Sequence, residues 1–600
     1  MKLKRSWIVV VVTLIIGLGN VQAKGLHVTV DGITRASGDI DSPMSLEWAF
    51  ASLNRAGDTI LIHGGDYYGN FNCWASGDEN NPLVIMPYNN EVVRIIGAGN
   101  SDNTLSLNGD WCVVRDLIIT QTHRDRVSTS NHSWPDDVNT EEGVTLVGRG
   151  VKFINNIVHD VYSNGVIGSG SNGVNAEVSG NIIFNTGWIG SGNGHGHGMY
   201  LQNNEGTKQT RNNIIFNTYG HGIQFFTTGA QQLNGINIEQ NIVFNAGAPA
   251  VESGVGSMRN MMLGGDAAVD NLVVRKNYSY MADNSTGTGM QVGYNTISES
   301  CRIEENYIAG GNKVFVFYRF KSGVIQNNTI IGDSNELLNS VYFPEDVSIR
   351  GEYNWNLNSY YADEEKFYDA NNNKTLDFEG WQNQVNVDEN SNLKTASAKP
   401  NMVKVIPNDY QEGRGHIVVY NWEARDEVYV DLGDVLKKGE TYTVFDVENI
   451  FEPLMTGTYN GSGVNIPMNL SKVIQPAGNG VYPISHTSSE FGVFLVTKTK
   501  SASRVPTSTV DTSVDQQSEE MRVYPNPSNT FFNCDFVAEN SGLASIQLID
   551  LSGRSVVSRE QSIFRGENKI VLDVAGLNEG IYILSVSHDG KTETTKVKVY

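Results

Sequence analysis

The sequence predicts an all-β protein built around a parallel β-helix, and three observations support this fold class. Glycine makes up 62 of the 600 residues and proline only 15, a balance typical of a folded chain with many tight turns. Short runs of β-branched and aromatic residues alternate with Gly, Asn and Asp along most of the chain. One short phrase containing asparagine also returns many times, which indicates a repeat architecture.

Residues 1–23 predict a cleavable secretory signal peptide. They have a basic start, an apolar run from Trp7 to Leu18 and a short V-Q-A end before Lys24. The apolar run is too short to span a bilayer comfortably, and no later segment is long and apolar enough to do so. We therefore expect no transmembrane segment in the mature chain.

The β-helix is predicted over residues 24–395, and its first part reads as successive strands. Residues 26–120 contain short runs such as LHVTV, PLVIMPYNN and VVRIIGAG, separated by turn-forming residues. Residues 44–57 differ because their apolar residues recur at helical spacing, namely Leu46, Ala49, Phe50 and Leu53. We expect one short helix that caps the stack of strands.

The repeated phrase occupies residues 143–331 and is typified by GNIIFN, NNIIFN and QNIVFN. Its asparagines are separated by 22 to 36 residues, about one rung of a parallel β-helix. In such a fold, equivalent asparagines stack at the turns and form hydrogen bonds along the solenoid. The expected members are Asn156, Asn181, Asn213, Asn241, Asn277, Asn306 and Asn328.

A second set of strands fixes the register, because its residues alternate between apolar and mixed. The residues expected inside are Met199, Leu201, Ile223, Phe225, Met261, Leu263, Met290, Val292, Phe315 and Phe317. The residues expected outside are Tyr200, Gln202, Gln224, Phe226, Met262, Gln291, Tyr318 and Arg319. Long loops at 121–140, 186–196 and 246–259 would lie on that outer side.

Three further segments follow the β-helix. Residues 396–500 contain HIVVYNW, EVYVDL and GVFLVT and predict a small β-sandwich. Residues 501–520 are rich in Ser, Thr, Asp and Gln, the composition of a flexible linker. Residues 521–600 again consist of strand-like runs and predict a second small β-sandwich.

The repeats resemble those of the right-handed parallel β-helix family, the pectate-lyase-like superfamily of secreted carbohydrate-active proteins. The resemblance covers about residues 26–395 and rests on the N-x-I-x-x-N turns and on the phrase GHGHGMYLQNNEG. It implies a right-handed solenoid and a polysaccharide as the partner. It is much less specific for the reaction than for the fold.

Residues 521–600 resemble the C-terminal sorting domain of the type IX secretion system of Bacteroidetes. V-Y-P-N-P (523–527), D-L-S-G-R (550–554) and L-x-x-G-I-Y (577–582) stand in the order of that family. The resemblance implies that the type IX secretion machinery exports the chain over the outer membrane. The protein would then be secreted or attached to the cell surface, with the sorting domain cut away.

Charge and cysteine content narrow the classes of partner and scaffold. The formal net charge of −23 disfavours nucleic acid as a partner but does not exclude an acidic polysaccharide, because a binding face can be locally basic. Four cysteines, Cys73, Cys112, Cys301 and Cys534, are too few for a disulfide-built scaffold. Cys73 and Cys112 could pair, or both could be buried thiols.

The candidate site is the polar cluster around GHGHGMYLQNN and YGHGIQFF. His197 and His221 each lie just before a strand on adjacent rungs, so we expect their rings to stack about 5 Å apart. Tyr200 and Gln224 should lie one above the other in the same way. The remaining candidate substrate-binding residues are Gln202, Asn203, Gln291, Arg319 and Lys321.

This mixture of His, Tyr, Gln, Arg and Lys favours β-elimination on a uronate-containing glycan over hydrolysis. Elimination requires a neutralised carboxylate, a base for the α-proton and an acid for the leaving oxygen. We assign the base to His197 or His221 and the acid to Tyr200. Gln224, Gln291 and Arg319 would hold the carboxylate.

Two alternatives remain open. A hydrolase would use two carboxylic acids, for which the candidates are Asp136, Asp137, Glu205, Glu252 and Asp266, with Trp134 able to stack on a sugar. A non-catalytic protein would use the same solenoid as a glycan-binding surface or adhesin. Gly-His-Gly can also be a turn whose imidazole only satisfies the backbone.

No metal site is predicted, and the need for a cofactor stays open. His195 and His197 lack a clear third zinc ligand. Residues 369–379 resemble a calcium loop, but Lys374 replaces the needed glycine and Glu379 falls one place early. Calcium that bridges substrate carboxylates is compatible with the sequence, which contains no clear site for it.

Overall fold

The computed structural model describes residues 23–499 and 521–599, except for the short stretches given at the end of this sentence: 54, 98, 100–102, 123–124, 131–134, 191–193, 228–232, 254–257, 283–285, 333–335, 345–352, 480–481, 525, 527, 529–530, 539–541, 551–553, 564–565 and 589–590. The predicted signal peptide, apart from its last residue, and the predicted linker lie outside the described residues. The chain forms two compact units, Met1–Ser501 and Ala502–Tyr600.

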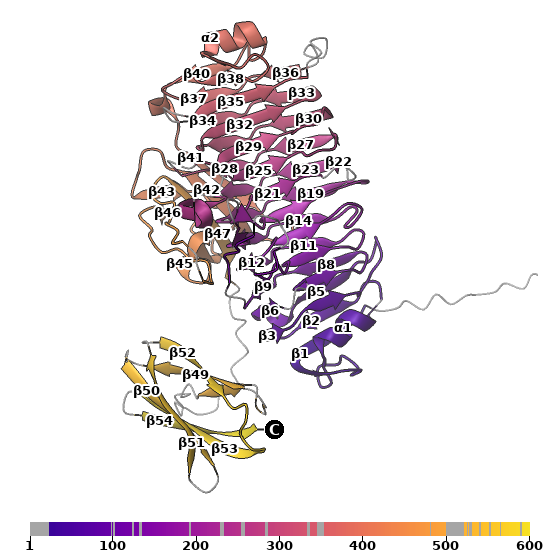
Figure 1. Cartoon of the computed structure of the whole chain (residues 1–600), viewed down its shortest axis with the longest axis vertical. Helices are drawn as coiled ribbons and strands as arrows, with labels where there is room; N and C mark the ends of the chain where they lie inside the picture. Colours follow the sequence, from indigo (N-terminus) through magenta and orange to yellow (C-terminus); the bar gives the residue numbers. More distant parts are fainter. Residues whose placement is uncertain are drawn as a thin grey trace, which may run out of the picture. The chain divides into compact units, whose positions relative to one another are not determined.

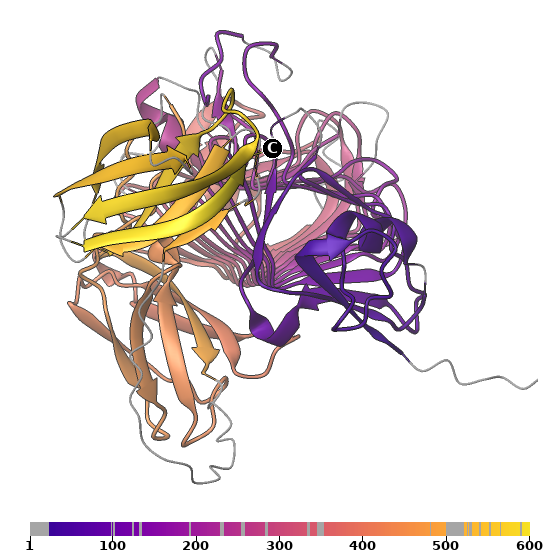
Figure 2. The same cartoon turned by 90° about the horizontal axis from the view of Figure 1, so that it is seen from below.

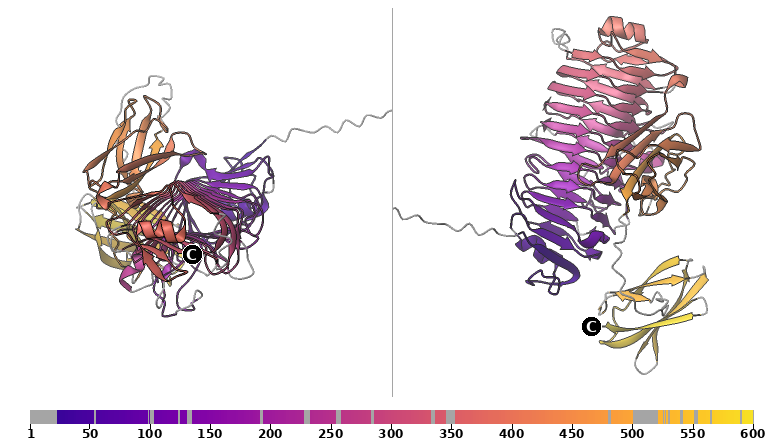
Figure 3. Two further views of the ribbon diagram at one scale, coloured as in Figure 1. Left: turned by 90° about the horizontal axis from the view of Figure 1, so that it is seen from above. Right: turned by 180° about the vertical axis from the view of Figure 1, so that it is seen from behind.

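The first unit contains a right-handed parallel β-helix, as the sequence predicts. Successive strands of the chain join three sheets in turn, and each sheet has twelve strands among the described residues (Figures 1 and 3). The first sheet contains β1 (Gly25–Ile33), β2 (Thr59–Ile62), β5 (Leu83–Pro87), β8 (Cys112–Arg115), β11 (Lys152–Ile154), β14 (Glu177–Ser179), β19 (Lys208–Arg211), β23 (Ile236–Glu239), β27 (Leu272–Arg275), β30 (Ser298–Glu304), β33 (Phe320–Gln326) and β36 (Tyr353–Asn356).

The second sheet carries the residues of the predicted site. Its strands are β4 (Phe71–Cys73), β7 (Leu105–Leu107), β10 (Val144–Leu146), β13 (Val166–Gly168), β18 (Met199–Leu201), β21 (Ile223–Phe225), β25 (Arg259–Leu263), β29 (Thr288–Val292), β32 (Lys313–Tyr318), β35 (Leu337–Tyr342), β38 (Phe367–Asp369) and β39 (Lys374–Leu376). All pairs in this sheet are parallel except the last, β38 with β39.

The third sheet follows the first along each rung. Its strands are β3 (Gly65–Tyr68), β6 (Val93–Gly97), β9 (Ile118–Gln121), β12 (Ile157–His159), β15 (Ile182–Phe184), β20 (Ile214–Phe216), β24 (Ile242–Phe244), β28 (Tyr278–Tyr280), β31 (Tyr307–Ala309), β34 (Thr329–Ile331), β37 (Ser359–Tyr361) and β40 (Asn392–Lys394). The long loops predicted beside the site connect this sheet back to the second one.

The solenoid interior is filled as the alternation predicts. The predicted inward residues of the second sheet, such as Met199, Phe225 and Phe317, are at most 1% exposed and belong to one continuous core. The predicted helix is α1 (Leu46–Ser52), which begins at the N-cap Ser45 and buries its apolar face against this core. All four cysteines are buried and none forms a disulfide bond, so for Cys73 and Cys112 the predicted alternative of buried thiols is the one observed.

An asparagine ladder runs along the corner between the first and third sheets. The backbone N–H and the side-chain Nδ2 of each ladder asparagine donate to Oδ1 of the next, from Asn156 through Asn328, as predicted. Each Nδ2 also donates to a backbone carbonyl. The ladder continues to Asn358 and ends at the buried carboxylate of Asp388, two members that the sequence pattern did not reveal.

A β-sandwich covers the third sheet. Its larger sheet contains β41 (Met402–Pro407), β42 (Arg414–Tyr420), β47 (Phe491–Lys498), β44 (Thr441–Asp446) and β45 (Pro453–Thr458), and its smaller sheet contains β43 (Glu427–Val430) and β46 (Val464–Pro467). Phe491 stacks on Tyr280 with ring centroids 4.4 Å apart, and the hydroxyl of Tyr420 donates to the carbonyl of Ser279. Figure 2 shows the sandwich, in orange, against the side of the solenoid.

The second unit is a small antiparallel β-protein with its own core. Its strands are β48 (Arg522–Tyr524), β49 (Phe531–Ala538) and β52 (Gly566–Asp573) in one sheet, and β51 (Ser555–Ile563), β50 (Gly542–Asp550), β53 (Gly580–His588) and β54 (Lys591–Val599) in the other. None of the helices within the described ranges has the length and hydrophobicity of a membrane span.

Candidate functional site

The second sheet is the face of the solenoid on which a site can form. The third sheet is covered by the sandwich. The first sheet carries charged side chains that neutralise one another across its strands, as in the pairs Arg211–Glu177 at 3.1 Å and Arg275–Glu239 at 2.9 Å. On the second sheet, by contrast, the outward side chains are mostly uncharged, and polar and aromatic residues alternate with Ile167 and Met262.

These outward residues form a row in which each member pairs with the next by strand register. The row passes through Ser106, Thr145, Ile167, Tyr200, Gln224, Met262 and Gln291. The predicted placement of Tyr200 beside Gln224 is therefore confirmed. Two polar atoms of the row, Thr145 Oγ1 and Gln224 Oε1, are buried and have no hydrogen-bond partner within the described part of the chain. Such atoms are exceptional, because buried polar groups are normally hydrogen-bonded.

Beside this row lies a second column of polar side chains, which we call the mixed column: Glu142, Asn164, His197, His221 and Arg259. From Asn164 onward, the backbone N–H of each member donates to the side chain of the member on the preceding rung. Asn164 N–H reaches Glu142 Oε2 at 2.7 Å, and His197 N–H reaches Asn164 Oδ1 at 2.9 Å. The rings of His197 and His221 stack with centroids 5.1 Å apart and planes 9° apart, which confirms the predicted stack.

The hydrogen bonds of the mixed column determine which ring nitrogen carries a proton. Nδ1 of His197 accepts from the backbone N–H of His221 at 2.8 Å, and Nδ1 of His221 accepts from that of Arg259 at 2.9 Å. Burial lowers the pKa of His197 to about 3 and that of His221 well below its ordinary value. Both rings are therefore neutral at neutral pH and carry their proton on Nε2. This arrangement suits a hydrogen-bond donor better than the predicted base.

Arg259, at the end of the mixed column, was not among the predicted site residues. Its Nε donates to Oε1 of Gln291 at 2.6 Å, and its guanidinium forms no ion pair with a carboxylate of the described residues. Burial lowers its pKa, whereas the nearby phenols of Tyr294 and Tyr318 raise it. A half-buried cation without a counter-ion is costly, and a bound anion would relieve that cost.

Two phenols, those of Tyr294 and Tyr318, lie near Arg259 on the outer face of the second sheet. Burial raises the pKa of Tyr318, and the charge of Arg259 opposes that rise. Tyr294 packs edge-on against Phe226, with ring centroids 5.3 Å apart. Burial likewise raises the pKa of Tyr200, which lies two rungs away from Arg259, about 10 Å by strand spacing. The phenols of Tyr200 and Tyr318 therefore remain protonated at neutral pH and can donate.

Two predicted binding residues, Gln202 and Asn203, directly follow β18 and form hydrogen bonds within the fold. Gln202 is 5% exposed, accepts from Gly170 N–H and donates to the carbonyl of Phe226. Asn203 is fully buried and donates to the carbonyls of Gly206 and Asn234. Both side chains hold the corner between the second and first sheets, and their role in substrate binding stays a prediction.

The other three predicted binding residues lie in different places. Gln291 is on the outward row, where it orients Arg259 and is itself 3% exposed. Arg319 sits at the corner after β32 with a positive φ of 53°, bonded to the carbonyl of Asn295 and stacked over Tyr342. Lys321 follows that corner into the first sheet, where it pairs with Glu299 at 2.6 Å, so it does not join the site.

A positional signal could have revealed the missed members. Glu142, Asn164 and Arg259 each stand three residues before an outward residue of the row, Thr145, Ile167 and Met262 respectively. His197 and His221 stand in the same relation to Tyr200 and Gln224. Burial raises the pKa of Glu142 to about 7.

The loops beside the mixed column are fixed by the buried Arg126. Its guanidinium donates to the carbonyls of Val161, Asn185 and Gly187 and pairs with Asp160 at 3.2 Å. It lies 4.0 Å over the ring of Tyr162, and its Nε donates to the carbonyl of Ala477 in the sandwich. The loop after β9 is thereby tied to both the solenoid and the sandwich.

No two of the carboxylic acids predicted for a hydrolase form a pair within the described residues. Asp137 accepts from Ser128 and Thr129, and these hydrogen bonds lower its pKa to about 2. Glu205 pairs with Arg149, and Asp266 accepts from Asn295. Asp136 is exposed. Trp134 and the side chain of Glu252 lie outside the described residues.

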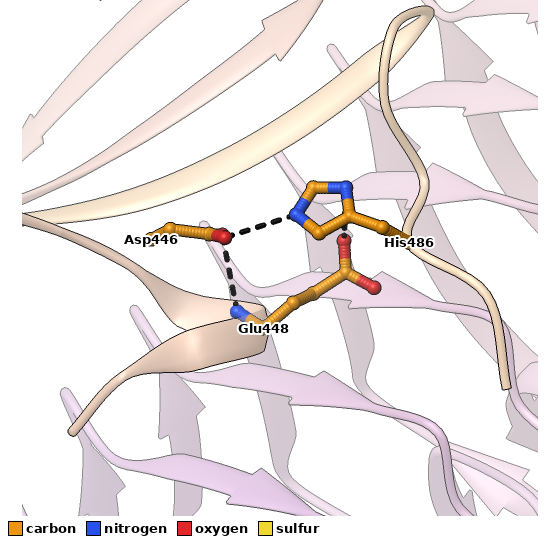
Figure 4. A group of neighbouring side chains, drawn as sticks. All are labelled: Asp446, Glu448 and His486. Carbon is orange, nitrogen blue, oxygen red and sulfur yellow. Dashed lines mark hydrogen bonds and ion pairs between the residues drawn. The ribbon is translucent and has the colours of Figure 1, made fainter. Parts of the chain in front are cut away.

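One group in the sandwich has the residue types of a metal site. Asp446, Glu448 and His486 offer ligand atoms within 4.8 Å of one another (Figure 4). His486 Nε2 lies 2.9 Å from Asp446 Oδ2, and its Nδ1 accepts from the backbone N–H of Ser488. Because both ring nitrogens already have protein partners, the group fits a buried structural cluster better than a metal centre. The predicted calcium-like loop forms the β38–β39 hairpin, in which Asp369 bonds its own turn.

Residues 522–600 match the family model described as a secretion system C-terminal sorting domain. The match places this domain where the sequence predicts it and confirms export by type IX secretion, so the protein is secreted or attached to the cell surface. No curated protein is significantly similar to the chain in sequence.

Several solved structures are similar to the chain at low identity. Pectate lyase Pel9A is 14% identical, with 54% of this chain and 78% of that chain covered and a TM-score of 0.40. XylC in complex with xylose is 11% identical, and the match covers 78% of this chain and 99% of that chain with a TM-score of 0.41. The family 6 polysaccharide lyase Pedsa3628 from Pseudopedobacter saltans is 12% identical, with 59% and 91% covered and a TM-score of 0.36. Their activities are their own, because one fold hosts many activities.

Proposed function

We propose that the protein is a secreted polysaccharide-degrading enzyme, a lyase that cleaves a uronate-containing glycan by β-elimination on the outer face of its second sheet. The observation that carries the proposal is Arg259, a half-buried guanidinium with no carboxylate partner in the described chain and with two phenols beside it. An anionic sugar supplies the missing counter-charge.

The residues around Arg259 can perform the three tasks of an elimination. Arg259 binds the uronate carboxylate and stabilises the negative charge that develops when the neighbouring carbon loses its proton. Tyr294 and Tyr318 share the two proton transfers: Tyr294 takes the proton from carbon after losing its own hydroxyl proton to solvent, and Tyr318, whose pKa burial raises, protonates the leaving oxygen. The electron pair of the broken C–H bond forms the C=C bond as the C–O bond breaks.

His197, His221 and Tyr200 then bind neighbouring sugars. A sugar whose carboxylate lies on Arg259 cannot also place its scissile bond at Tyr200, because two rungs separate the residues by about 10 Å. The Nε2–H groups of the two histidines donate to hydroxyl or carboxylate oxygens along the chain. Gln224 Oε1, which has no partner among the described residues, accepts from a sugar hydroxyl.

The test is product analysis of the mature protein on alginate, polygalacturonate, glycosaminoglycans and neutral glycans. The proposal expects ultraviolet absorbance of unsaturated uronate on one acidic polymer only. Arg259→Gln and Tyr318→Phe should each lower kcat/KM at least about a hundredfold, whereas Tyr429→Phe, on the sandwich, should not. New reducing ends without that absorbance would indicate a hydrolase and contradict elimination.

A glycan-binding protein or adhesin is the second candidate. The observation that favours it is the mixed column, whose histidines serve the fold through Nδ1 whether or not catalysis occurs. In that case the protein binds an acidic polymer and Arg259→Gln weakens binding, but no product forms from any polymer tested.

A further inference from the structure

The outward row of the second sheet continues past the mixed column toward the first rungs of the solenoid. Asn72 on β4 pairs with Ser106 on β7, which pairs with Thr145 on β10. Trp74 stands two residues after Asn72, so it points to the same side of the sheet. Its side chain is 56% exposed, although large aromatic residues are usually mostly buried.

Amide groups surround this tryptophan. Asn108 follows Leu107, the register partner of Cys73, and therefore lies beside Trp74 on the next rung. Asn108 Nδ2 lies 3.4 Å from Asn72 Oδ1, and Asn72 is exposed. An exposed indole face flanked by amides has the chemistry to stack on a sugar ring and bond its hydroxyls.

The spacing of the solenoid connects this place to the proposed reaction centre. Six strand steps of the second sheet separate β4 from β25, which carries Arg259. At about 4.8 Å a step this is about 29 Å, and one pyranose extends a linear glycan by about 5 Å. A chain that runs along the solenoid axis therefore advances by about one sugar a rung. Thr145 Oγ1, a buried atom with no partner in the described chain, lies on the path between them.

We propose that Trp74, with Asn72 and Asn108, forms a distal subsite for a sugar residue about six positions from the sugar held by Arg259. The subsite extends the proposed function and rests on it. It makes the protein selective for long chains, because a short oligosaccharide cannot reach Trp74 and Arg259 together.

The experiment compares Trp74→Ala with the parent protein in binding a trimer and an octamer of galacturonate and of mannuronate. Calorimetry is carried out in a Tyr318→Phe background, so that cleavage does not consume the ligand. We expect Trp74→Ala to weaken octamer binding about tenfold and to leave trimer binding unchanged. Tyr429→Ala, which removes an equally exposed aromatic residue of the sandwich, is the matched control and should change neither.

Two results would overturn the subsite while leaving the proposed function intact. One is unchanged octamer affinity in Trp74→Ala, and the other is an equal loss for trimer and octamer, which would indicate a structural role. Binding of neither series by the parent protein would instead contradict the proposed substrate class, and the subsite would fall with it. Thermal melting of each variant confirms that the fold is kept.

Discussion

Two columns of side chains run along the solenoid, the asparagine ladder and the mixed column. In both, a backbone N–H donates to a side chain on a neighbouring rung, but the columns serve different purposes. In the asparagine ladder every member is the same residue up to Asn358, is at most 2% exposed and uses both atoms of its amide within the protein. In the mixed column the members differ, and the fold uses only one acceptor atom of each histidine.

The difference between the two columns shows at which positions the fold determines the residue type. A ladder position must both accept and donate inside the protein, so only an amide fits there without leaving a buried group unpaired. A mixed-column position needs only an acceptor for the next backbone N–H, which a carboxylate, an amide or an imidazole can supply. The identity of His197 and His221 is therefore set by what their outer atoms do, and Nε2–H is the group left for that purpose.

The largest expected effect is the loss of a ladder member. Asn241→Leu would leave the backbone N–H of Asn213 and the carbonyl of Thr210 without their partners in the core. We expect the free energy of unfolding to fall by about 3–5 kcal/mol. Urea denaturation of the mature protein measures this, and a loss below about 1 kcal/mol would show that the ladder is not a required element.

The same kind of substitution in the mixed column should separate stability from function. His221→Asn keeps an acceptor for the N–H of Arg259, so we expect the free energy of unfolding to change by less than about 1 kcal/mol. Glycan affinity should nevertheless fall, because the Nε2–H donor is gone. His221→Phe removes both the acceptor and the donor, so both stability and glycan affinity should fall. Equal glycan affinity of His221→Asn and the wild type would mean that the column is purely structural.

A smaller effect concerns Lys208, a fully buried lysine whose ammonium donates, within the described residues, to the carbonyls of Asn172 and Gln202. Burial lowers its pKa to about 7. Between about pH 7 and pH 10 the unfolded chain binds more protons at this group than the native chain, so its contribution to stability improves as the pH rises.

Lys208→Met removes the pH dependence of stability that Lys208 causes. The substitution should raise the free energy of unfolding most at or below about pH 7, and this increase should shrink toward pH 9. Lys438→Met, at an exposed lysine of the sandwich, is the control. The measurement is urea denaturation of both variants across this pH range. A gain that does not change with pH would show that Lys208 keeps an ordinary pKa in the fold.

The two columns were predictable to different degrees. The ladder followed from one repeated phrase, and its last two members were missed. Asn358 lies beyond the repeats at 143–331, and N-V-D-E-N places Asp388 where the pattern calls for asparagine. The stack of His197 on His221 followed from register alone. The protonated nitrogen could not be predicted, because it depends on which backbone N–H the corner presents to Nδ1.

The predicted binding residues show the same limit. Lys321 was placed on the site because it was grouped with Tyr318 and Arg319 on one rung, whereas the positive φ of Arg319 turns the chain into the first sheet there. Arg259 was missed because alternation within the strands does not reach the corner, although it stands three residues before Met262, as His197 and His221 stand before Tyr200 and Gln224. Its importance comes from a missing partner, which only coordinates can reveal.

The most direct test of the central claim is the affinity of Gln291→Glu for the acidic polymer that the wild-type protein selects. The substitution places a carboxylate where an amide oxygen now lies 2.6 Å from Arg259 Nε, so the cation receives an internal counter-ion. We predict a fold at least as stable and an affinity at least about tenfold lower. Unchanged affinity in a folded Gln291→Glu protein would contradict the assignment of Arg259 as the anion-binding group.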